Sequence, residues 1–292
     1  MHQLWLSIGF GFVTASVIAV AAVGLSLQFG ITNYINFAYG DFMALGAYLT
    51  WELNAGFLHW NIWVAMVGGS LLVGVFAVVV NRIVLDPFAR RFDRVFYVLI
   101  VTFALSLIIL SLLNSIWGAN VRRFNMASET PMHIGPFLLT VDQLIVIAIG
   151  LVLMVAIHLL LTRTRLGKSM RAMSDSTTLA MTSGIDTRRI TTITWFLTGI
   201  LAGLAGSVLG ITASSITPSF GETFLFVIFA AVIVGGVGSV YGAILGALMI
   251  GLVTEVSAVF INASYKLDTA FVVLILVLLF RPSGLFARVG KV

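Results

Sequence analysis

Residues 4–27 read LWLSIGFGFVTASVIAVAAVGLSL, an apolar run of 24 residues without a charged side chain. A helix needs about 20 mostly apolar residues to cross the hydrocarbon core of a bilayer. The apolar part of a secretory signal is shorter, about 7–15 residues, and follows a basic start. Here Met1-His2-Gln3 carries no fixed positive charge. We therefore expect the run to be a retained transmembrane helix.

Further apolar runs follow along the chain. Five are long: Ile62–Val80, Val95–Trp117, Gln143–Leu161, Ile190–Ile211 and Ala243–Ile261. Three are weaker, namely Phe42–Phe57 with Glu52 inside it, Phe224–Val234 ending at two glycines, and the short Thr269–Phe280. The pattern predicts an all-α polytopic membrane protein with about eight transmembrane helices, some interrupted by glycine, in a single domain over residues 1–292.

The composition agrees with a membrane protein and argues against catalysis. Apolar residues make up 60% of the chain and charged residues 9%, whereas soluble domains carry about 25% charged residues. The chain has no cysteine, which excludes disulfides and thiol chemistry. The four histidines show no metal-ligand spacing, and no Ser/His/Asp arrangement can be argued. We expect a non-enzymatic chain that binds no metal, no cofactor and no nucleic acid.

The basic residues are concentrated in three places. These groups hold 13 of the 16 Lys and Arg residues: Arg82, Arg90, Arg91 and Arg94; Arg163, Arg165, Lys168, Arg171, Arg188 and Arg189; Arg281, Arg288 and Lys291. Loops rich in Lys and Arg face the cytoplasm. We expect these groups inside and the amino terminus outside. Arg122, Arg123 and Lys266 would lie outside too, near Glu129, Asp142, Glu222 and Asp268.

Two short segments resemble each other and suggest an internal duplication. Tyr39-Gly40 precedes Leu45-Gly46-Ala47, and Tyr241-Gly242 precedes Leu245-Gly246-Ala247. Paired interruptions in two halves of a transporter point to its substrate path. Chance similarity in a chain rich in Gly, Ala and Leu is an equal alternative.

The cytoplasmic stretch 162–189 has the pattern of an amphipathic helix outside the bilayer. Leu166, Met170, Met173, Thr177 and Ala180 recur at helical spacing. Gly184 suits the end of this helix, and Asp186 or Thr187 can cap the next one. Such a rigid element suits a coupling loop that passes movement from a cytoplasmic partner into the membrane. A helix lying on anionic lipid headgroups explains the pattern equally well.

The same stretch contains Gly167-Lys168-Ser169, which is similar to the end of a phosphate-binding loop. That motif requires a glycine five residues before its second glycine, because backbone amides wrap the phosphates. Thr162 stands at that position. The chain is therefore not expected to bind nucleotide, and the energy for transport must come from elsewhere.

Two further segments are candidates for the translocation path. Asn33, Asn36, Tyr39 and Asp41 place polar groups in or near the membrane, where they usually face a water-filled path. Gly235, Gly236 and Gly238 interrupt a helix and permit close backbone approach. The alternative for the first set is an ordinary cytoplasmic connection, and for the second plain helix packing.

Several motifs together resemble the permease subunits of branched-chain amino-acid ABC importers, closest to the LivH type. They are Gly24–Gly30, Ile35–Phe42, Leu45–Tyr48, Leu166–Ala172 with Asp175, Ala180 and Gly184-Ile185-Asp186, then Gly199–Gly206, Gly235–Ser239 and Arg281–Phe286. The resemblance implies an importer permease of a bacterial-type inner membrane, working by alternating access. Gly167, Met170, Arg171, Met173, Asp175, Ala180 and Gly184 would then serve ATPase coupling.

By the same resemblance, the partners would be a homologous second permease, two cytoplasmic ATPases and an extracytoplasmic binding protein that delivers Leu, Ile, Val or a similar solute. Tyr39 stands where the family usually has His, and Thr177-Thr178-Leu179 where it has an acid followed by two alanines. These departures leave the solute and the docking contacts open, since related permeases carry urea, short amides or simple sugars. An ion-coupled carrier or channel, and a non-transporting scaffold, are the remaining alternatives.

Overall fold

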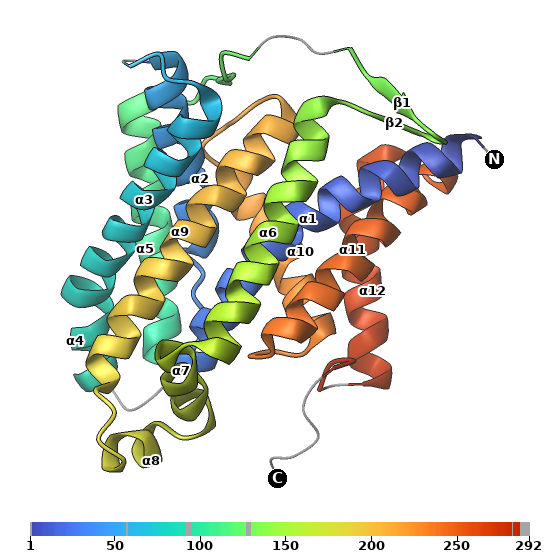
Figure 1. Cartoon of the computed structure of the whole chain (residues 1–292). Helices are drawn as coiled ribbons and strands as arrows, with labels where there is room; N and C mark the ends of the chain where they lie inside the picture. Colours follow the sequence, from blue (N-terminus) through green and yellow to red (C-terminus); the bar gives the residue numbers. More distant parts are fainter. Residues whose placement is uncertain (1, 57, 92–94, 127–129, 282, 287–292) are drawn as a thin grey trace.

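The computed structural model describes residues 2–56, 58–91, 95–126, 130–281 and 283–286, which form a bundle of helices (Figure 1). Within these ranges, six helices are long and apolar enough to cross a membrane. They are α1 (His2–Thr32), α3 (Ile62–Val80) continued by η2 (Asn81–Leu85) and α4 (Asp86–Arg91), α5 (Val95–Trp117), α6 (Val141–Arg163), α9 (Thr187–Ala213) and α11 (Val240–Phe260).

Three shorter apolar helices complete the bundle. They are α2 (Tyr39–Trp51), extended by the π-helical turn η1 (Glu52–Gly56), α10 (Phe220–Gly235) and α12 (Lys266–Phe280), which follows the 3-10 turn η3 (Ala263–Tyr265). The described residues therefore hold six long and three short membrane helices, in agreement with the expected count of about eight.

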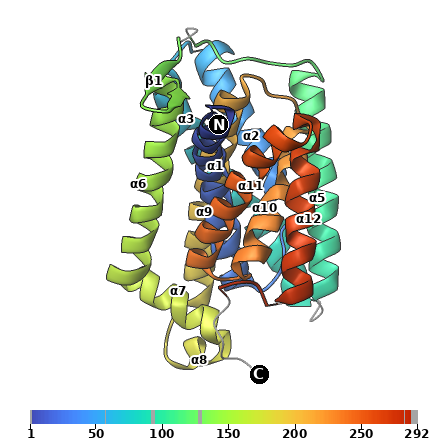
Figure 2. The same ribbon diagram turned by 90° about the vertical axis from the view of Figure 1, so that its right-hand side faces the viewer.

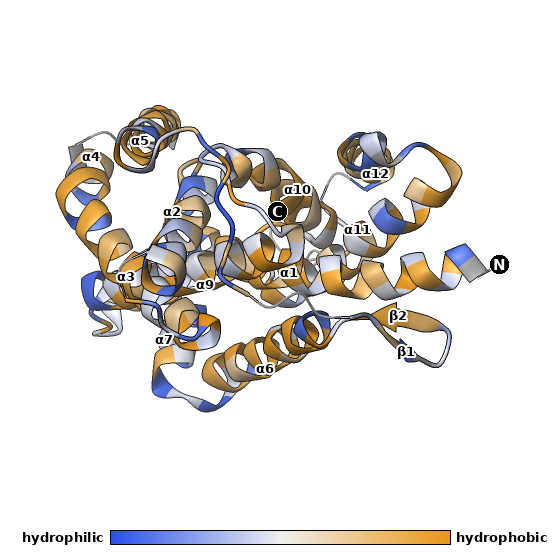
Figure 3. Ribbon diagram, turned by 90° about the horizontal axis from the view of Figure 1, so that it is seen from above, coloured by the Kyte–Doolittle hydropathy of each residue, from blue (hydrophilic) through white to orange (hydrophobic). Residues whose placement is uncertain are grey.

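The bundle has an inner and an outer group of helices. Seen from one end, α1, α2, α9 and α10 lie inside, and α3, α5, α6, α11 and α12 surround them with largely apolar outer faces (Figure 3). On α6, for example, Leu151, Val152 and Val155 are each more than half exposed. Exposed apolar side chains on the outer face of a membrane-spanning helix bundle face lipid.

Small residues bring the inner and outer helices into backbone contact. A Cβ on Gly251 of α11 would lie 2.5 Å from Cα of Ala15 on α1, and a Cβ on Gly203 of α9 would lie 2.7 Å from Cα of Ser70 on α3. Close approach at small residues is how helices associate in lipid, where the hydrophobic effect does not drive them together.

The helices α1–α2–α3 and α9–α10–α11 are two copies of one motif with opposite orientations. Each first helix is followed at once by a residue in the left-handed conformation, Asn33 (φ 57°) and Ser214 (φ 53°). Six non-helical residues follow, 33–38 and 214–219, and then a short helix begins. Those helices open with matching triplets, Tyr39-Gly40-Asp41 and Phe220-Gly221-Glu222.

This repeat differs from the duplication expected from the sequence. Tyr39 begins α2, whereas Tyr241 lies in the first turn of α11, which is the counterpart of α3. The expected pairing was therefore wrong, because short Gly/Ala/Leu matches recur wherever helices pack closely. A more specific signal was present in Gly30-Ile31-Thr32 and Gly210-Ile211-Thr212, which precede the two interruptions.

The basic segments lie at one end of the bundle. Helices α4, α7 (Arg165–Asp175) and α8 (Thr177–Thr182) and the carboxyl end of α12 share the lower end in Figure 1. The amino terminus lies at the opposite end, beside the hairpin of β1 (Met132–Ile134) and β2 (Phe137–Leu139). By the positive-inside rule the lower end is cytoplasmic. Arg94, Glu129, Arg288 and Lys291 are outside the described residues.

One acidic residue has a different place from the one expected. The sequence suggested that Glu222 lies in an extracytoplasmic loop. In the structure it belongs to the first turn of α10, and the neighbouring Gly221 contacts Gly40 inside the bundle. The loop ends earlier because residues 214–219 run inward without helical structure.

Candidate functional site

The two short inner helices α2 and α10 begin at a common point. A Cβ on Gly40 would lie 2.5 Å from the carbonyl oxygen of Gly221, and a Cβ on Gly221 would lie 2.1 Å from the carbonyl oxygen of Gly40. Side chains at either position would collide with backbone, so glycine is required. We call Gly40, Asp41, Gly221 and Glu222 the midplane junction.

The junction lies deep in the bilayer. The 16 residues of α10 run from it to the turn at the cytoplasmic end, a helix length of about 24 Å, and the hydrocarbon core of a bilayer is about 30 Å thick. Helix α2 occupies the upper and α10 the lower part of the interior (Figure 2). Half-helices that meet within the membrane build the substrate sites of many transporters.

The junction combines two helix amino termini with two carboxylates. Each amino terminus carries a partial positive charge and unpaired N–H groups, which an acid in the first turn offsets. Asp41 is fully buried, and one carboxylate oxygen accepts a hydrogen bond from Ser106 of α5, while Oδ1 has no partner among the described residues. Glu222 is partly exposed. This arrangement offers amides to an anion and a carboxylate to a cation.

Residues 33–38 are held between α1 and α5. Asn36 Oδ1 accepts a hydrogen bond from the N–H of Ala38 (3.1 Å), and its Nδ2 donates to Gln28 Oε1 (3.4 Å). The N–H of Phe37 donates to Thr102 Oγ1 on α5 (3.3 Å). Asn36, Tyr39 and Asp41 are thus brought together as buried groups. The sequence missed Gln28, Thr102 and Ser106, because polar residues in long apolar helices give no periodic signal.

Asn33 is separated from these residues. It caps the carboxyl end of α1 in the left-handed conformation and is exposed at the cytoplasmic end. The N–H of Asn33 donates to the carbonyl of Phe29 (2.8 Å). The structure therefore places Asn33 six residues before Tyr39, at the end of α1 and outside the midplane junction.

Gly235, Gly236 and Gly238 form the cytoplasmic turn between α10 and α11. A Cβ on Gly235 would lie 2.0 Å from the carbonyl oxygen of Gly242, so these two helix ends pack backbone to backbone. Gly236 (φ 105°) and Gly238 (φ 80°) have left-handed conformations that the turn requires. These glycines lie at the opposite end of α10 from the junction, which makes them candidates for a hinge.

The carboxyl-terminal motif packs on this turn. A Cβ on Gly284 would lie 2.6 Å from Cα of Gly236, and the N–H of Leu285 donates to the carbonyl of Val234 (2.8 Å). Gly284 and Leu285 therefore pack against the end of α10 and hold it in place.

The coupling stretch forms two helices where the sequence suggested one. Helix α7 ends at Asp175, and Ser176 is extended (φ −161°). Ser176 Oγ accepts a hydrogen bond from the N–H of Leu179 (3.3 Å) and so caps α8. The stripe of apolar residues continues across the break, which is why a single helix was expected.

The residues singled out in this stretch divide between two faces. Gly167, Met170, Met173 and Ala180 are buried against the bundle. Gly167 is required there, because a Cβ would lie 2.1 Å from the carbonyl oxygen of Leu160 on α6. The others, Arg171, Asp175 and Gly184, are exposed.

The expected helix end at Gly184 is confirmed. Gly184 has φ 80°, and the N–H of Ile185 donates to the carbonyl of Ala180 (3.0 Å), the long bond of a Schellman motif. Asp186 Oδ1 then accepts a hydrogen bond from the N–H of Arg189 (3.0 Å) and caps α9. The segment is thus fixed at both ends to membrane helices.

Two apolar side chains of α8 point away from the bundle. Leu179 is 68% exposed and Met181 is 59% exposed. They lie beyond the membrane, where exposed apolar groups mark a protein contact surface. The sequence analysis did not select them, although two apolar residues on either side of a buried alanine were a visible signal.

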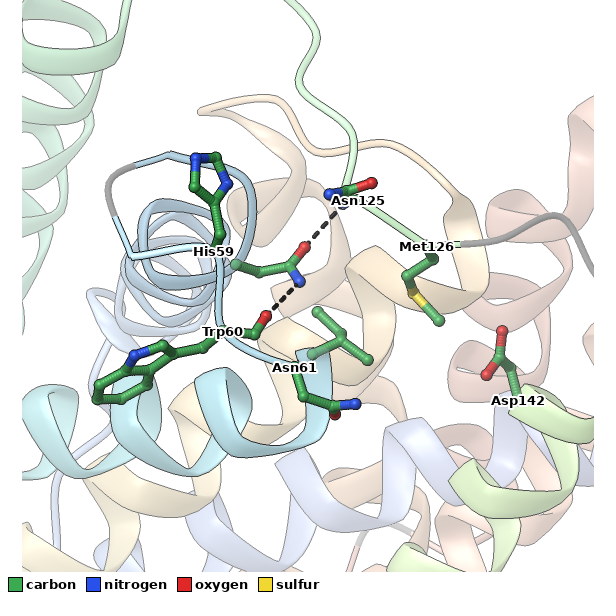
Figure 4. A pocket seen from close by; sticks show the side chains of 8 residues that line it. His59, Trp60, Asn61, Asn125, Met126 and Asp142 are labelled. Atoms are coloured by element: carbon green, nitrogen blue, oxygen red, sulfur yellow. Dashed lines mark hydrogen bonds between the residues drawn. The ribbon is translucent and has the colours of Figure 1, made fainter.

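The extracytoplasmic end carries a cavity of about 340 Å³ (Figure 4). Asn54 organises its wall: Oδ1 accepts a hydrogen bond from the N–H of Asn125 (2.8 Å), and Nδ2 donates to the carbonyl of Trp60 (2.9 Å). Further lining residues are His59, Asn61, Met126 and Asp142. These hydrogen bonds connect the loops, and their polar side chains form a continuous surface.

Charged groups near the membrane ends are paired. Glu255 bonds to Lys266 Nζ (2.6 Å) and to Thr14 Oγ1 (3.0 Å), and Glu52 accepts a hydrogen bond from Trp117 Nε1 (2.9 Å). These carboxylates serve the packing of helix ends and do not form a chain toward the junction.

A polytopic helical bundle with an inverted repeat and half-helices meeting inside the bilayer defines a membrane transport protein. Residues 7–280 match the model of the family described as "Branched-chain amino acid transport system / permease component", and the chain belongs to this family. It is a multi-pass protein of the bacterial-type inner membrane and one component of a larger transport system.

Individual relatives agree with the family and show its breadth. The chain is 26% identical to the high-affinity branched-chain amino acid permease protein LivH of Escherichia coli, over 95% of this chain and 94% of the relative. It is 32% identical to the ribose import permease protein RbsC of Bacillus subtilis over 44% of this chain and 43% of the relative. The fold is similar to PsaBC from Streptococcus pneumoniae in complex with Fab (TM-score 0.51, 14% identity, 94% and 91% coverage).

Proposed function

We propose that the chain is the permease subunit of an ABC importer for branched-chain amino acids. The observation that carries this proposal is the coupling segment of residues 162–189, attached to the bundle by buried residues and exposing Leu179 and Met181. The chain has no phosphate-binding loop of its own. Separate ATPases therefore supply the energy, and this chain binds no cofactor and catalyses no reaction.

The midplane junction supports a zwitterionic solute. The amide groups at the start of α2 and α10 suit a carboxylate, and Glu222 suits an ammonium group. Aromatic side chains continue from the junction, with Phe37 packed 5.4 Å from Phe229 between ring centroids. These rings suit the apolar side chain of leucine, isoleucine or valine.

The exposed face of α10 supports a second permease as partner. Thr223 and Phe226 are exposed and Glu222 is partly exposed, at a depth where lipid would surround them. A carboxylate facing hydrocarbon is costly, so such residues normally face protein or a water-filled path. A homologous permease packed between α5 and α12 covers this face and closes the path (Figure 3).

The two ends of the bundle suit the other partners. Two cytoplasmic ATPases bind at α8, one on each permease. An extracytoplasmic binding protein docks on the polar loops around Asn54 and His59 (Figure 4) and delivers the solute. A ligand that binds two states equally cannot shift them, so ATP binding and hydrolysis drive the alternation.

A related solute is the second candidate. The partial similarity to a ribose permease favours a sugar or another small solute in the same fold. Carboxylates also bind sugar hydroxyls, so the junction suits such a solute as well.

The test is uptake by the assembled system in proteoliposomes. The chain is purified with its co-expressed partners and reconstituted. Binding protein is added, and ATP is supplied inside or outside the vesicles according to the orientation of the complex in the membrane. We expect ATP-dependent uptake of radiolabelled leucine, with ribose and urea as comparison solutes. Uptake of ribose instead of leucine would replace the solute, and ATP-independent uptake by the chain alone would refute the importer assignment.

A further inference from the structure

A second cavity, of about 370 Å³, lies at the cytoplasmic end between the coupling segment and the bundle. Four elements enclose it: the end of α1, the end of α6, helix α7 and the turn from α10 to α11. This volume lies within the usual range of small-molecule sites. We call it the cytoplasmic cavity.

Helix ends of opposite polarity meet in this cavity. Helix α1 ends there at Thr32, with the last carbonyl groups at its negative end. Helix α11 begins there at Val240, and Ser239 Oγ accepts a hydrogen bond from the N–H of Gly242 (3.1 Å). The N–H groups of Val240 and Tyr241 belong to the first turn, which has no intrahelical acceptors. One wall thus suits a cation and another suits an anion.

Side chains bring both charges to the cavity as well. Arg171 and Asp175 of α7 both line the cavity, together with the apolar Leu27, Ile31 and Met170. Ser26 also lines it, is fully buried, and its Oγ has no hydrogen-bond partner among the described residues. Of the seven buried polar side-chain atoms without a partner in the described part of the chain, this is the one whose residue lines the cavity, so a ligand there can pair with it.

We infer that the cytoplasmic cavity binds an amino acid with an apolar side chain from the cytoplasm and thereby slows transport. The carboxylate lies at the start of α11 near Arg171, the ammonium group at the end of α1, and the side chain against Leu27, Ile31 and Met170. This inference rests on the proposed function, because the ligand is the imported solute itself.

Its position gives the ligand a means of inhibition. Helix α7 forms one wall of the cavity and also belongs to the segment that receives the movement of the ATPases. A ligand bound between α7 and the bundle holds them in one arrangement, and a ligand that prefers one state of a cycle shifts the protein toward it. Accumulated product therefore limits further import.

The first experiment measures binding without transport. The purified chain in nanodiscs is equilibrated with radiolabelled leucine, with leucinamide and 4-methylpentanoate as competitors that each lack one charge. We expect leucine to bind and both analogues to compete poorly. Val237→Trp, at a rim position that is 43% exposed, should block the cavity and remove its share of this binding, leaving only leucine held at the midplane junction. Ser111→Leu, on the exposed face of α5, is the control and should bind normally.

The lipid of the nanodisc distinguishes two sources of a zwitterion. Phosphatidylethanolamine also carries an anion beside an ammonium group. If leucine binds only when this lipid is replaced by phosphatidylglycerol, the headgroup is the natural occupant and the inference is overturned. Equal binding in both lipids supports a site for amino acids.

The second experiment measures uptake by the complete assembly with leucine preloaded on the cytoplasmic side. If occupancy of the cavity blocks the cycle, an internal leucine concentration ten times the dissociation constant should slow uptake roughly tenfold. Val237→Trp should remove this slowing. Two results would overturn this inference and leave the proposed function intact. In one, internal leucine does not slow otherwise normal leucine uptake; in the other, it slows uptake equally in the wild type and in Val237→Trp. Absence of leucine uptake in the wild type would count against the proposed function, and the binding experiment would still decide the cavity.

Discussion

The midplane junction and the coupling segment differ in how each is held. At the junction, backbone contacts backbone at Gly40 and Gly221, and Asp41 is enclosed on every side. The coupling segment is buried on one face, through Met170 and Met173, and exposed on the other. The first arrangement tolerates no added atoms, while the second leaves a surface for a partner. Under the proposed function, this difference assigns solute selectivity and energy supply to separate parts of one chain.

A second contrast exists within the junction itself. Asp41 and Glu222 occupy matching positions in the two repeats, but Asp41 is buried against Ser106 and Glu222 is partly exposed. The same backbone motif thus provides a closed, structural carboxylate in one half and an accessible one in the other. Substitutions can test both contrasts.

The largest effect is expected from Gly221→Leu at the junction. The new side chain would overlap the carbonyl of Gly40, and overpacking of this kind costs roughly 1–3 kcal/mol or more. We expect a lower unfolding temperature and no uptake. Gly68→Ala is the control, since its Cβ meets the flexible end of Leu53 (3.1 Å). Both variants are compared by thermal unfolding in detergent and by uptake. A Gly221→Leu variant that is stable and active would refute the close contact.

The next effect concerns the exposed face of the coupling segment. Replacing both Leu179 and Met181 by serine removes the apolar surface offered to the ATPase. We expect the complex to lose its ATPases on gel filtration and uptake to fall by an order of magnitude or more, since buried apolar anchors contribute about 2 kcal/mol or more. Thr182→Ala is the control. Retained ATPases with normal uptake would move the docking surface elsewhere.

Glu222→Gln and Asp41→Asn separate the two carboxylates. A hydrogen bond to a charged group contributes about 1.5–3 kcal/mol, so Glu222→Gln should raise the leucine concentration for half-maximal uptake about tenfold or more with little change in unfolding temperature. Asp41→Asn should mainly lower the unfolding temperature. The reverse result for the two acids would exchange their roles.

Asn36→Ala should also weaken uptake without loss of assembly.

The smallest effect is expected at the end of the coupling segment. Gly184 has φ 80° and its Cβ would meet no atom within 4 Å, so Gly184→Leu suffers only from its backbone conformation, a cost of about 1–2 kcal/mol. We expect ATP hydrolysis to continue with less uptake per ATP. Gly184→Asn should restore coupling, because asparagine tolerates this conformation. An unchanged ratio in Gly184→Leu would argue against a rigid link.

Much of the fold could be predicted from the sequence. Apolar length alone located the long helices, and the Lys and Arg residues located the cytoplasmic end, because both follow directly from the bilayer. The capping residues Gly184 and Asp186 were also predictable, since their local geometry depends on few neighbours.

The site was predicted less well, for physical reasons. Glu222 was assigned to a loop because residues 214–219, which read SSITPS, have the composition of a surface loop, although the structure carries them inward. The break at Ser176 was missed because the apolar stripe continues across it. Long-range contacts such as Asp41 with Ser106 depend on how helices pack, and a single sequence does not encode them locally.

The most direct test of the account uses the absence of cysteine from the natural sequence. Thr223→Cys places one thiol beside Glu222 in the complete assembly. We predict that a water-soluble thiol reagent reaches it from one side of the membrane, that leucine protects it, and that binding of an ATP analogue to the ATPases changes the accessible side. A thiol that reacts only with lipid-soluble reagents, whatever the nucleotide, would contradict a solute path at the midplane junction.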